Sequence, residues 1–241
     1  MKSHVVVAHY GEDLGWLGAA AEAWPADSVS VFVYSKAPVA EPLPALSALP
    51  ALSALPARSA LPRARVVRRP NVGREAETWL HHVTEHFDDL PETVYFLQGD
   101  PFDHVRAKDR AALRAGALPA AVPGAPTPIF ADPISEARGA QGVDHASYHA
   151  LLFDAPVPAR HRFAPGAQYA VRREDVLAKP REFYRRLADM LRASPHVANT
   201  RAFPFAPDSI DPWSIERMWP GIFAAAVRAR PEMTRPLPEM T

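Results

Sequence analysis

The densest group of chemically versatile side chains lies in the segment QGDPFDH, residues 98–104. It combines the amide of Gln98 with the carboxylates of Asp100 and Asp103 and the imidazole of His104, directly after a hydrophobic run. These groups could bind a cation, relay a proton or form a carboxylate–imidazole pair. A turn is the structural alternative, because glycine, proline and aspartate are all common in turns.

A second group lies in NVGREAETWLHHVTEH, residues 71–86, where a glycine precedes an expected helix start. The amino end of a helix favours an anion, so Arg74 could belong to an anion site, while Glu75 could bind a cationic group. An exposed ion pair on a capped helix is the alternative. His82 and His86 have the spacing of zinc ligands on a helix. Because the sequence has no HExxH pattern, we expect partly buried histidines there rather than a metal site.

Carboxylates at two other places are further candidates. Glu12 and Asp13 directly follow the first expected strand, where they could bind a guanidinium or a metal, or cap the next helix. Glu216 lies one helical turn before Trp219 and could be either a catalytic base or a surface carboxylate.

Alternating strands and helices would position these groups. Short β-branched runs predict strands at residues 4–9, 29–36, 63–70 and 93–100, and apolar residues at helical spacing predict a helix over 74–87. This order predicts an α/β fold with a mostly parallel central sheet flanked by helices. Sites in such sheets lie at the carboxyl ends of the strands, which is where the segment QGDPFDH begins.

The second half of the chain predicts a short strand at 168–171 and an amphipathic helix at 181–192. Another helix should begin with Asp211 as its cap and Pro212 in its first turn. Pro220 should kink or break that helix, because proline lacks the amide hydrogen that an interior helical residue donates.

Composition excludes several classes of protein. Apolar residues make up 48% of the 241 residues, which is enough for a core and argues against a disordered chain. The absence of cysteine excludes disulfides and thiolate chemistry. Basic and acidic residues number 27 each, so net charge points to no class of partner. With no apolar run near 20 residues and no signal-peptide pattern, we expect a cytoplasmic protein without a membrane span.

We predict a single domain over residues 1–228 with an insertion at 42–62 and a proline-rich, frayed tail at 229–241. The insertion repeats a hexapeptide of the type ALSALP, and its regular prolines exclude a continuous helix. We interpret it as a tandem duplication in a surface loop. The segment 116–162, rich in Pro, Gly and Ala, permits no assignment.

Five segments together resemble a known pattern: VVVAHYGEDLGWL, NVGREAETWLHHV, FLQGDPFDH, GAQYAVRREDVLAKPREFY and ERMWPGIF. In this order the chain resembles a family of hypothetical proteins from fungi and some bacteria, whose fold is similar to A-type nucleotide-sugar glycosyltransferases. The chain departs from that pattern at Gly11, Ser35 and Pro220. It also resembles the arginine-containing cyclodipeptide synthases, which join arginine to a second amino acid as a diketopiperazine, using aminoacyl-tRNAs.

The resemblance implies a transferase that needs no metal or other cofactor, because an aminoacyl ester is already activated and positioning can supply much of the rate. Carboxylates would bind the arginine guanidinium in fork geometry. The expected catalytic residues are Glu75, Asp100, His104 and Glu216, and the expected substrate contacts are Glu12, Asp13, Arg74, Gln98, Asp103 and Gln168. The second amino acid and the oligomeric state are left open.

Transfer RNA would be the partner, and two groups of arginines could contact its phosphates. Solvated surface charge is the alternative interpretation of each group. The arginines are Arg63, Arg65, Arg68 and Arg69 in the first group, and Arg185 and Arg186 in the second.

Two other functions stay open at this point. The first is a glycosyltransferase with a nucleotide-sugar donor, although such enzymes normally carry Asp-x-Asp after a central strand and GDPFDH spaces its aspartates three apart. The second is a non-catalytic binding protein built on a degenerate transferase fold.

Overall fold

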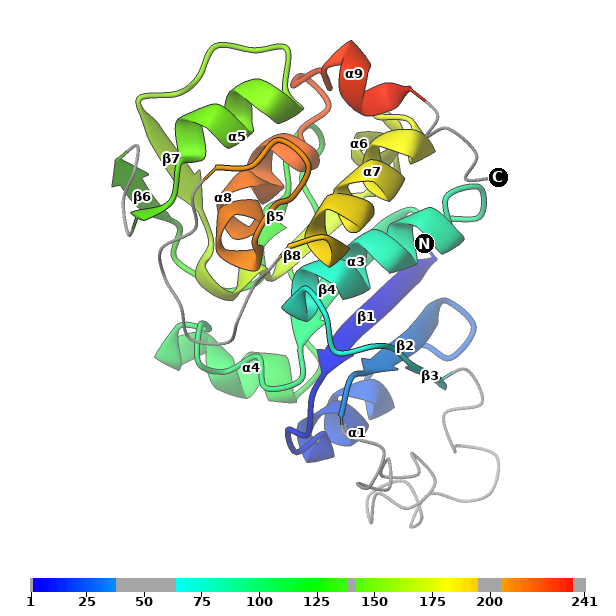
Figure 1. Cartoon of the computed structure of the whole chain (residues 1–241). Helices are drawn as coiled ribbons and strands as arrows, with labels where there is room; N and C mark the ends of the chain where they lie inside the picture. Colours follow the sequence, from blue (N-terminus) through cyan, green and yellow to red (C-terminus); the bar gives the residue numbers. More distant parts are fainter. Residues whose placement is uncertain (1, 38–63, 138–141, 195–204, 236–241) are drawn as a thin grey trace.

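The computed structural model describes residues 2–37, 64–137, 142–194 and 205–235, and its centre is a six-stranded mixed sheet (Figure 1). The strand order is β3-β2-β1-β4-β8-β5. The strands are β1 (Ser3–His9), β2 (Val29–Ser35), β3 (Ala64–Arg68), β4 (Thr93–Gln98), β5 (Thr127–Pro128) and β8 (Tyr169–Arg172). The predicted α/β class with a mostly parallel sheet is confirmed.

Four neighbouring strands, β3, β2, β1 and β4, run parallel to one another. At the centre, Val5 of β1 is in register with Val31 of β2 on one side and Tyr95 of β4 on the other. The chain therefore adds β2 and β3 on one side of β1 and then returns to add β4 on the other side. Such a switch point opens a crevice at the carboxyl ends of the strands, and this is the usual location of ligand sites in open α/β sheets.

The second half of the chain extends the sheet differently, because β8 runs antiparallel to both β4 and β5. In addition, β6 (Ile134–Ala137) and β7 (Arg160–Phe163) form a separate antiparallel hairpin. The hairpin and the helix α5 (His145–Leu152) lie in the segment 116–162, to which the sequence permitted no assignment.

Helices cover both faces of the sheet (Figure 1). On β1, Val6 belongs to one core with Trp79 and Trp219, whereas Val5 belongs to the other core with Leu17. This division follows from the alternation of side chains along a strand. The helices are α1 (Gly15–Glu22), η2 (Ala107–Asp109), α4 (Arg110–Arg114), α3 (Arg74–Glu85), η4 (Pro165–Ala167), α6 (Arg173–Leu177), α7 (Arg181–Arg192), α8 (Pro212–Ile222) and α9 (Pro231–Thr234).

The helix α8 tests two sequence predictions. Asp211 is its cap, and the carboxylate accepts hydrogen bonds from the amides of Trp213 and Ser214, both at 2.9 Å. The sequence predicted that Pro220 kinks or breaks the helix, and a break is wrong, because α8 continues to Ile222. Pro220 has no amide hydrogen to donate to the carbonyl oxygen of Glu216, but the neighbouring side chains Trp219 and Ile222 are fully buried, and their packing stabilises the helical conformation.

Part of the tail that was expected to be frayed is ordered. Residues 231–234 form α9, and Met233 is buried in the core that contains the apolar face of α7. The repeat insertion at 42–62, with Arg63 after it, lies outside the described residues. Across the parts of the chain that the structure describes, none of the helices has the length and apolar character needed to cross a membrane.

Candidate functional site

A cavity of about 700 Å³ lies at the switch point, at the carboxyl ends of β1, β2 and β4. The loop before α3, the end of α7 and the start of α8 complete its wall. Six residues expected from the sequence line this cavity: Glu12, Arg74, Glu75, Gln98, Asp100 and Asp103. Segments that are far apart in the chain therefore meet where the strand order predicted a site.

The cavity wall carries four carboxylates and three cationic side chains, but two of the cations have internal partners. The Lys36 ammonium donates to the carbonyl oxygens of Val72, at 2.7 Å, and Arg74, and it lies 3.1 Å from the carboxylate of Glu77. These three contacts use all three N–H donors of the Lys36 ammonium. Arg192 pairs with Asp189 at 2.8 Å. A ligand therefore meets mainly Glu12, Glu75, Asp100 and Asp103, with Arg74 as the principal cation.

The carboxylate of Glu77 forms a buried ionic centre behind the cavity. Its side chain is fully buried and pairs with Lys36, Arg69 and, at 3.5 Å, Arg192. Burial alone would raise the pKa of Glu77, but Lys36 and Arg69 outweigh it and hold the pKa below its ordinary value. Arg69, expected at the tRNA surface, thus has a partner inside the protein.

The loop before α3 has an uncommon backbone. Gly73 and Arg74 both have positive φ angles, of 60° and 52°. Gly73 also permits close packing, because a Cβ atom there would lie 2.6 Å from Cδ2 of Leu191 on α7. Since Lys36 binds the carbonyl oxygens on both sides of Gly73, the first turn of α3 is fixed with Glu75 in the cavity wall.

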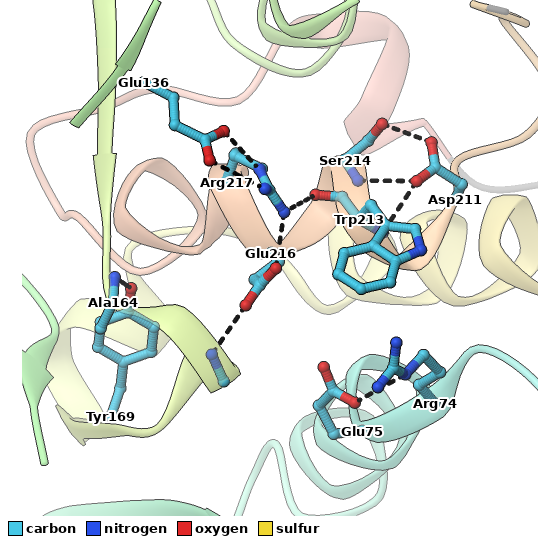
Figure 2. Close-up of polar contacts among 11 residues, drawn as sticks. Arg74, Glu75, Glu136, Ala164, Tyr169, Asp211, Trp213, Ser214, Glu216 and Arg217 are labelled. Carbon is cyan, nitrogen blue, oxygen red and sulfur yellow. Dashed lines mark hydrogen bonds and ion pairs between the residues drawn. The ribbon is translucent and has the colours of Figure 1, made fainter. Parts of the chain in front are cut away.

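Arg74 extends across the entrance towards α8. Its guanidinium carbon lies 5.0 Å from the ring centre of Trp213, a distance at which a cation–π interaction is attractive. Its Nε atom lies 3.7 Å from the carboxylate of Glu75, and about half of the Arg74 side chain is exposed. Figure 2 shows Arg74 and Glu75 on α3 opposite Trp213 and Glu216 on α8.

Glu216 is largely buried, with 12% of its side chain exposed. Burial raises the pKa of Glu216 to about 7, and the negative charge of Glu75 adds to this rise, whereas Arg217 opposes it. The carboxylate accepts hydrogen bonds from the amide of Gly166, at 2.8 Å, and from Nη1 of Arg217, at 2.7 Å. A carboxylate with a pKa near 7 can accept or donate a proton at neutral pH.

Arg217 joins Glu216 to the β6–β7 hairpin. Its guanidinium binds Glu136 through two hydrogen bonds, of 3.0 and 3.2 Å, and also donates to the carbonyl oxygen of Trp213 at 3.0 Å (Figure 2). Neither Glu136 nor Arg217 was a sequence candidate. The adjacency of Glu216 and Arg217 was a usable signal, but Glu136 lies 81 positions away in a segment without assignment.

The histidines of α3 belong to the core. The ring of His82 is fully buried and bonds to Nδ1 of His4, at 3.1 Å, and to the hydroxyl of Tyr34, at 2.9 Å. The ring of His86 packs against that of His82 with centroids 4.6 Å apart. Within the described parts of the chain, no group of three or more His, Asp or Glu side chains could hold a metal ion.

Four other expected residues lie outside the cavity wall as the described residues define it. Asp13 accepts the amide of Gly15 at 2.8 Å, just before α1, whose cap residue is Leu14. Gln168 is fully buried and bridges the amide of Gln98, at 3.2 Å, to the carbonyl oxygen of Pro101, at 3.0 Å. The other two are His104, whose ring packs against Gly166, and Glu216.

The described arginines that were expected to contact tRNA lie on or next to two elements, β3 and α7. Arg65 and Arg68 are exposed on β3, at the edge of the sheet. Arg185 is exposed on α7, with Glu182 at 3.5 Å, and Arg186 on the same helix is half-buried.

The fold and the cavity define an α/β protein with an acid-rich site at the switch point of its parallel strands. Its family is given by residues 102–237, more than half of the chain, which match the family described as "Protein of unknown function (DUF3431)". The chain belongs to this family. No curated protein and no solved structure matched the chain.

Proposed function

We propose that the protein is an aminoacyl-tRNA-dependent cyclodipeptide synthase that joins arginine to a second amino acid as a diketopiperazine. The observation that carries this proposal is the excess of carboxylates in the cavity wall that have no ion pair with another described residue, namely Glu12, Asp100 and Asp103 beside Glu75. Carboxylates bind a guanidinium in fork geometry, so this wall suits the side chain of an arginyl group. The resemblance to the cyclodipeptide synthases, noted from the sequence, supports the same substrate.

The reaction requires two amine attacks on esters. In the first, the α-amino nitrogen of one aminoacyl group attacks the ester carbonyl of the other, a C–N bond forms, and the ester C–O bond to the tRNA ribose breaks. The amine proton goes to a base and a proton returns to the leaving ribose oxygen. The second attack closes the ring in the same way and releases the second tRNA. Both steps start from activated esters, so no cofactor is required.

Acidic residues in the cavity wall and next to it are suited to these proton transfers. Glu216, with its pKa raised to about 7, is the proposed base, and Glu75 faces it from α3 (Figure 2). Asp100 and His104 follow β4 and are proposed as further catalytic groups. Gln98 and Arg74 would contact the substrate.

The acceptor stems of the tRNAs would contact the exposed arginines Arg65, Arg68 and Arg185 and the half-buried Arg186. The resemblance also supports a fold similar to the A-type glycosyltransferases as a finer description of the α/β sheet.

The test is a mass-spectrometric assay. Purified protein is incubated with total tRNA, the twenty amino acids, ATP and the charging enzymes. An arginine-containing diketopiperazine that disappears on ribonuclease treatment is the expected result, and its mass identifies the second amino acid. Absence of the product, when arginyl-tRNA is shown to be charged, overturns the proposal.

A glycosyltransferase with a nucleotide-sugar donor is the second candidate. The observation that favours it is the position of the cavity at a switch point, where nucleotides commonly bind. The carboxylates would repel a diphosphate unless a divalent cation lay between them. Hydrolysis of nucleotide sugars that depends on added manganese would support this candidate, and binding of tRNA without turnover of either donor would support a non-catalytic protein.

A further inference from the structure

The carboxylate of Glu216 is held at both oxygens by donors from different parts of the fold. Oε1 accepts the amide of Gly166, at 2.8 Å, and Oε2 accepts Nη1 of Arg217, at 2.7 Å. Gly166 is in η4, next to β8, and Arg217 is on α8 (Figure 2). The side chain of Glu216 therefore has little freedom to turn away from Glu75.

Arg217 is itself fixed on all sides. Only 3% of its side chain is exposed. Glu136 on β6 holds its Nε and Nη2 atoms in a fork, and Phe163 on β7 packs its ring 4.5 Å from the guanidinium carbon. The carbonyl oxygen of Trp213 takes a second hydrogen bond from Nη1. A bidentate pair of this kind defines the plane of the guanidinium, which a lysine ammonium could not do.

The guanidinium of Arg217 bridges two carboxylates that come from different elements, Glu136 on β6 and Glu216 on α8. Glu136 makes a two-point contact with the guanidinium, whereas Glu216 receives a single charged hydrogen bond from it. The orientation of the guanidinium towards Glu216 is therefore set from the β6–β7 hairpin.

We propose that Arg217, oriented by Glu136, is a positioning residue that holds the Glu216 carboxylate opposite Glu75 for proton transfer. This inference rests on the proposed function in so far as the transfer belongs to diketopiperazine formation. It adds two residues to the site, and it gives the β6–β7 hairpin the role of supporting the proposed base.

The groups that face Glu216 determine the direction of the expected pH effect. Arg217 and, more weakly, Arg74 lower the pKa of Glu216, and Glu75 raises it. The hydroxyl of Tyr169 on β8 is within electrostatic range, and His104 packs against the other side of Gly166. Removing the Arg217 charge should therefore raise the pKa of Glu216 further, by about one unit or more. The acid limb of the rate profile then moves to higher pH.

The experiment compares Arg217→Gln, Arg217→Lys and Glu136→Gln in steady-state assays from pH 5.5 to about 9. We expect Arg217→Gln to move the acid limb upward. Arg217→Lys should keep that limb near its original pH, because it keeps the charge, but should lower kcat about 10- to 100-fold, because it loses the fork. Glu136→Gln should lower kcat and leave KM for the aminoacyl-tRNA unchanged.

Controls separate these effects from misfolding. Arg230→Gln removes a half-exposed arginine from the start of α9 and should behave as the wild type. If Arg217→Gln fails to fold, as thermal melting would reveal, Glu136→Gln and Arg217→Lys still decide the question. Unchanged kcat and an unchanged pH profile in both would overturn the inference.

A direct titration distinguishes this inference from the proposed function. Carboxyl carbon NMR, with the Glu216 signal assigned by its loss in Glu216→Gln, reports the ionisation of Glu216 without any substrate. If the wild type forms no diketopiperazine but Arg217→Gln shifts this titration upward, the proposed function fails and the control of Glu216 by Arg217 stands. If product forms and the titration is the same in all variants, the inference fails and the function stands.

Discussion

The ammonium of Lys36 lies 3.1 Å from the carboxylate of Glu77, and both side chains are buried. The same ammonium holds the carbonyl oxygens of Val72 and Arg74, so this ion pair connects the core to the loop that presents Glu75. Burial lowers the pKa of Lys36, and Glu77 partly restores it. The pair therefore keeps its charges because each partner stabilises the other.

Removing either partner of this pair should destabilise the protein strongly. We expect Lys36→Met or Glu77→Gln to lower the free energy of unfolding by about 3–5 kcal/mol, because an uncompensated charge stays buried. The double variant should lose less than the sum of the two, and a urea-denaturation cycle measures the difference. The half-exposed pair of Arg106 and Asp109 is the matched control, and Arg106→Gln should lose about 1 kcal/mol or less. Strict additivity at Lys36 and Glu77 would contradict the coupling.

Glycine is required at position 73 for two separate reasons. Gly73→Ala would force a positive φ angle of 60° on alanine and place its Cβ atom 2.6 Å from Leu191. Gly124→Ala is the matched control, because its φ is 87° and no atom lies within 4 Å of the added Cβ. We expect about 1–2 kcal/mol of destabilisation at Gly124 from the backbone alone, and clearly more at Gly73. Equal melting temperatures for the two variants would show that the Leu191 side chain on α7 moves aside for the added Cβ atom at little cost.

Glu75 should matter for turnover far more than for folding. We expect Glu75→Gln to abolish diketopiperazine formation. The melting temperature should stay within a few degrees of the wild type, because the Glu75 side chain is only partly buried and its ion pair with Arg74 is long, at 3.7 Å. Glu85→Gln, at the exposed end of the same helix, serves as the control for charge and helix stability. Wild-type rates in Glu75→Gln would remove Glu75 from the site.

The buried histidines predict a loss of stability in acid. Burial, together with His86, lowers the pKa of His4 from 6.5 to about 4, and burial also lowers the pKa of His82 well below 6.5. Below pH 6.5 these two histidines bind protons in the unfolded chain but stay neutral in the folded chain. Their contribution to the free energy of unfolding is therefore fully present above pH 6.5 and is lost as the pH drops towards 4. The slope is up to about 1.4 kcal/mol per pH unit for each proton, and less for His4, which water partly screens.

Urea denaturation at a series of pH values measures this slope. His82→Phe should reduce the difference in stability between pH 6.5 and pH 4.5, while Asp and Glu residues elsewhere contribute equally to both proteins. The comparison variant is His86→Phe, which changes a half-buried ring that pairs with Asp89 at 3.2 Å. An unchanged slope in His82→Phe would mean that His82 is already charged in the folded protein.

The sequence predicted most of the first half of the fold, because the information there is local. The β-branched run of β1 and the helical spacing on α3 are visible without knowledge of their partners. The sequence predicted an amphipathic helix at 181–192, and on α7 the apolar residues Phe183, Leu187 and Leu191 are buried. The hairpin β6–β7 has weak alternation and a polar composition, so its pairing became visible only in three dimensions.

The residues of the site also fall into two groups: those that the sequence predicted and those whose contacts only the folded chain shows. Gln98, Asp100 and Asp103 line the cavity because they follow a strand at the switch point, a position that strand order alone indicates. In contrast, nothing near Arg217 in the sequence indicates that its guanidinium is held by Glu136, or that Lys36 and Arg69 converge on Glu77. Those contacts depend on how α8 and β3 pack, which periodicity does not encode.

The cavity described above combines early and late segments of the chain. Part of its wall follows β1, which ends at His9, whereas Trp213 in the same wall is on α8. A ribosome releases the strands β1 to β4 long before it releases α8. The nascent chain therefore exposes the carboxylates that follow β1 and β4 before α8 is made, and the cavity is complete only after α8 has been synthesised.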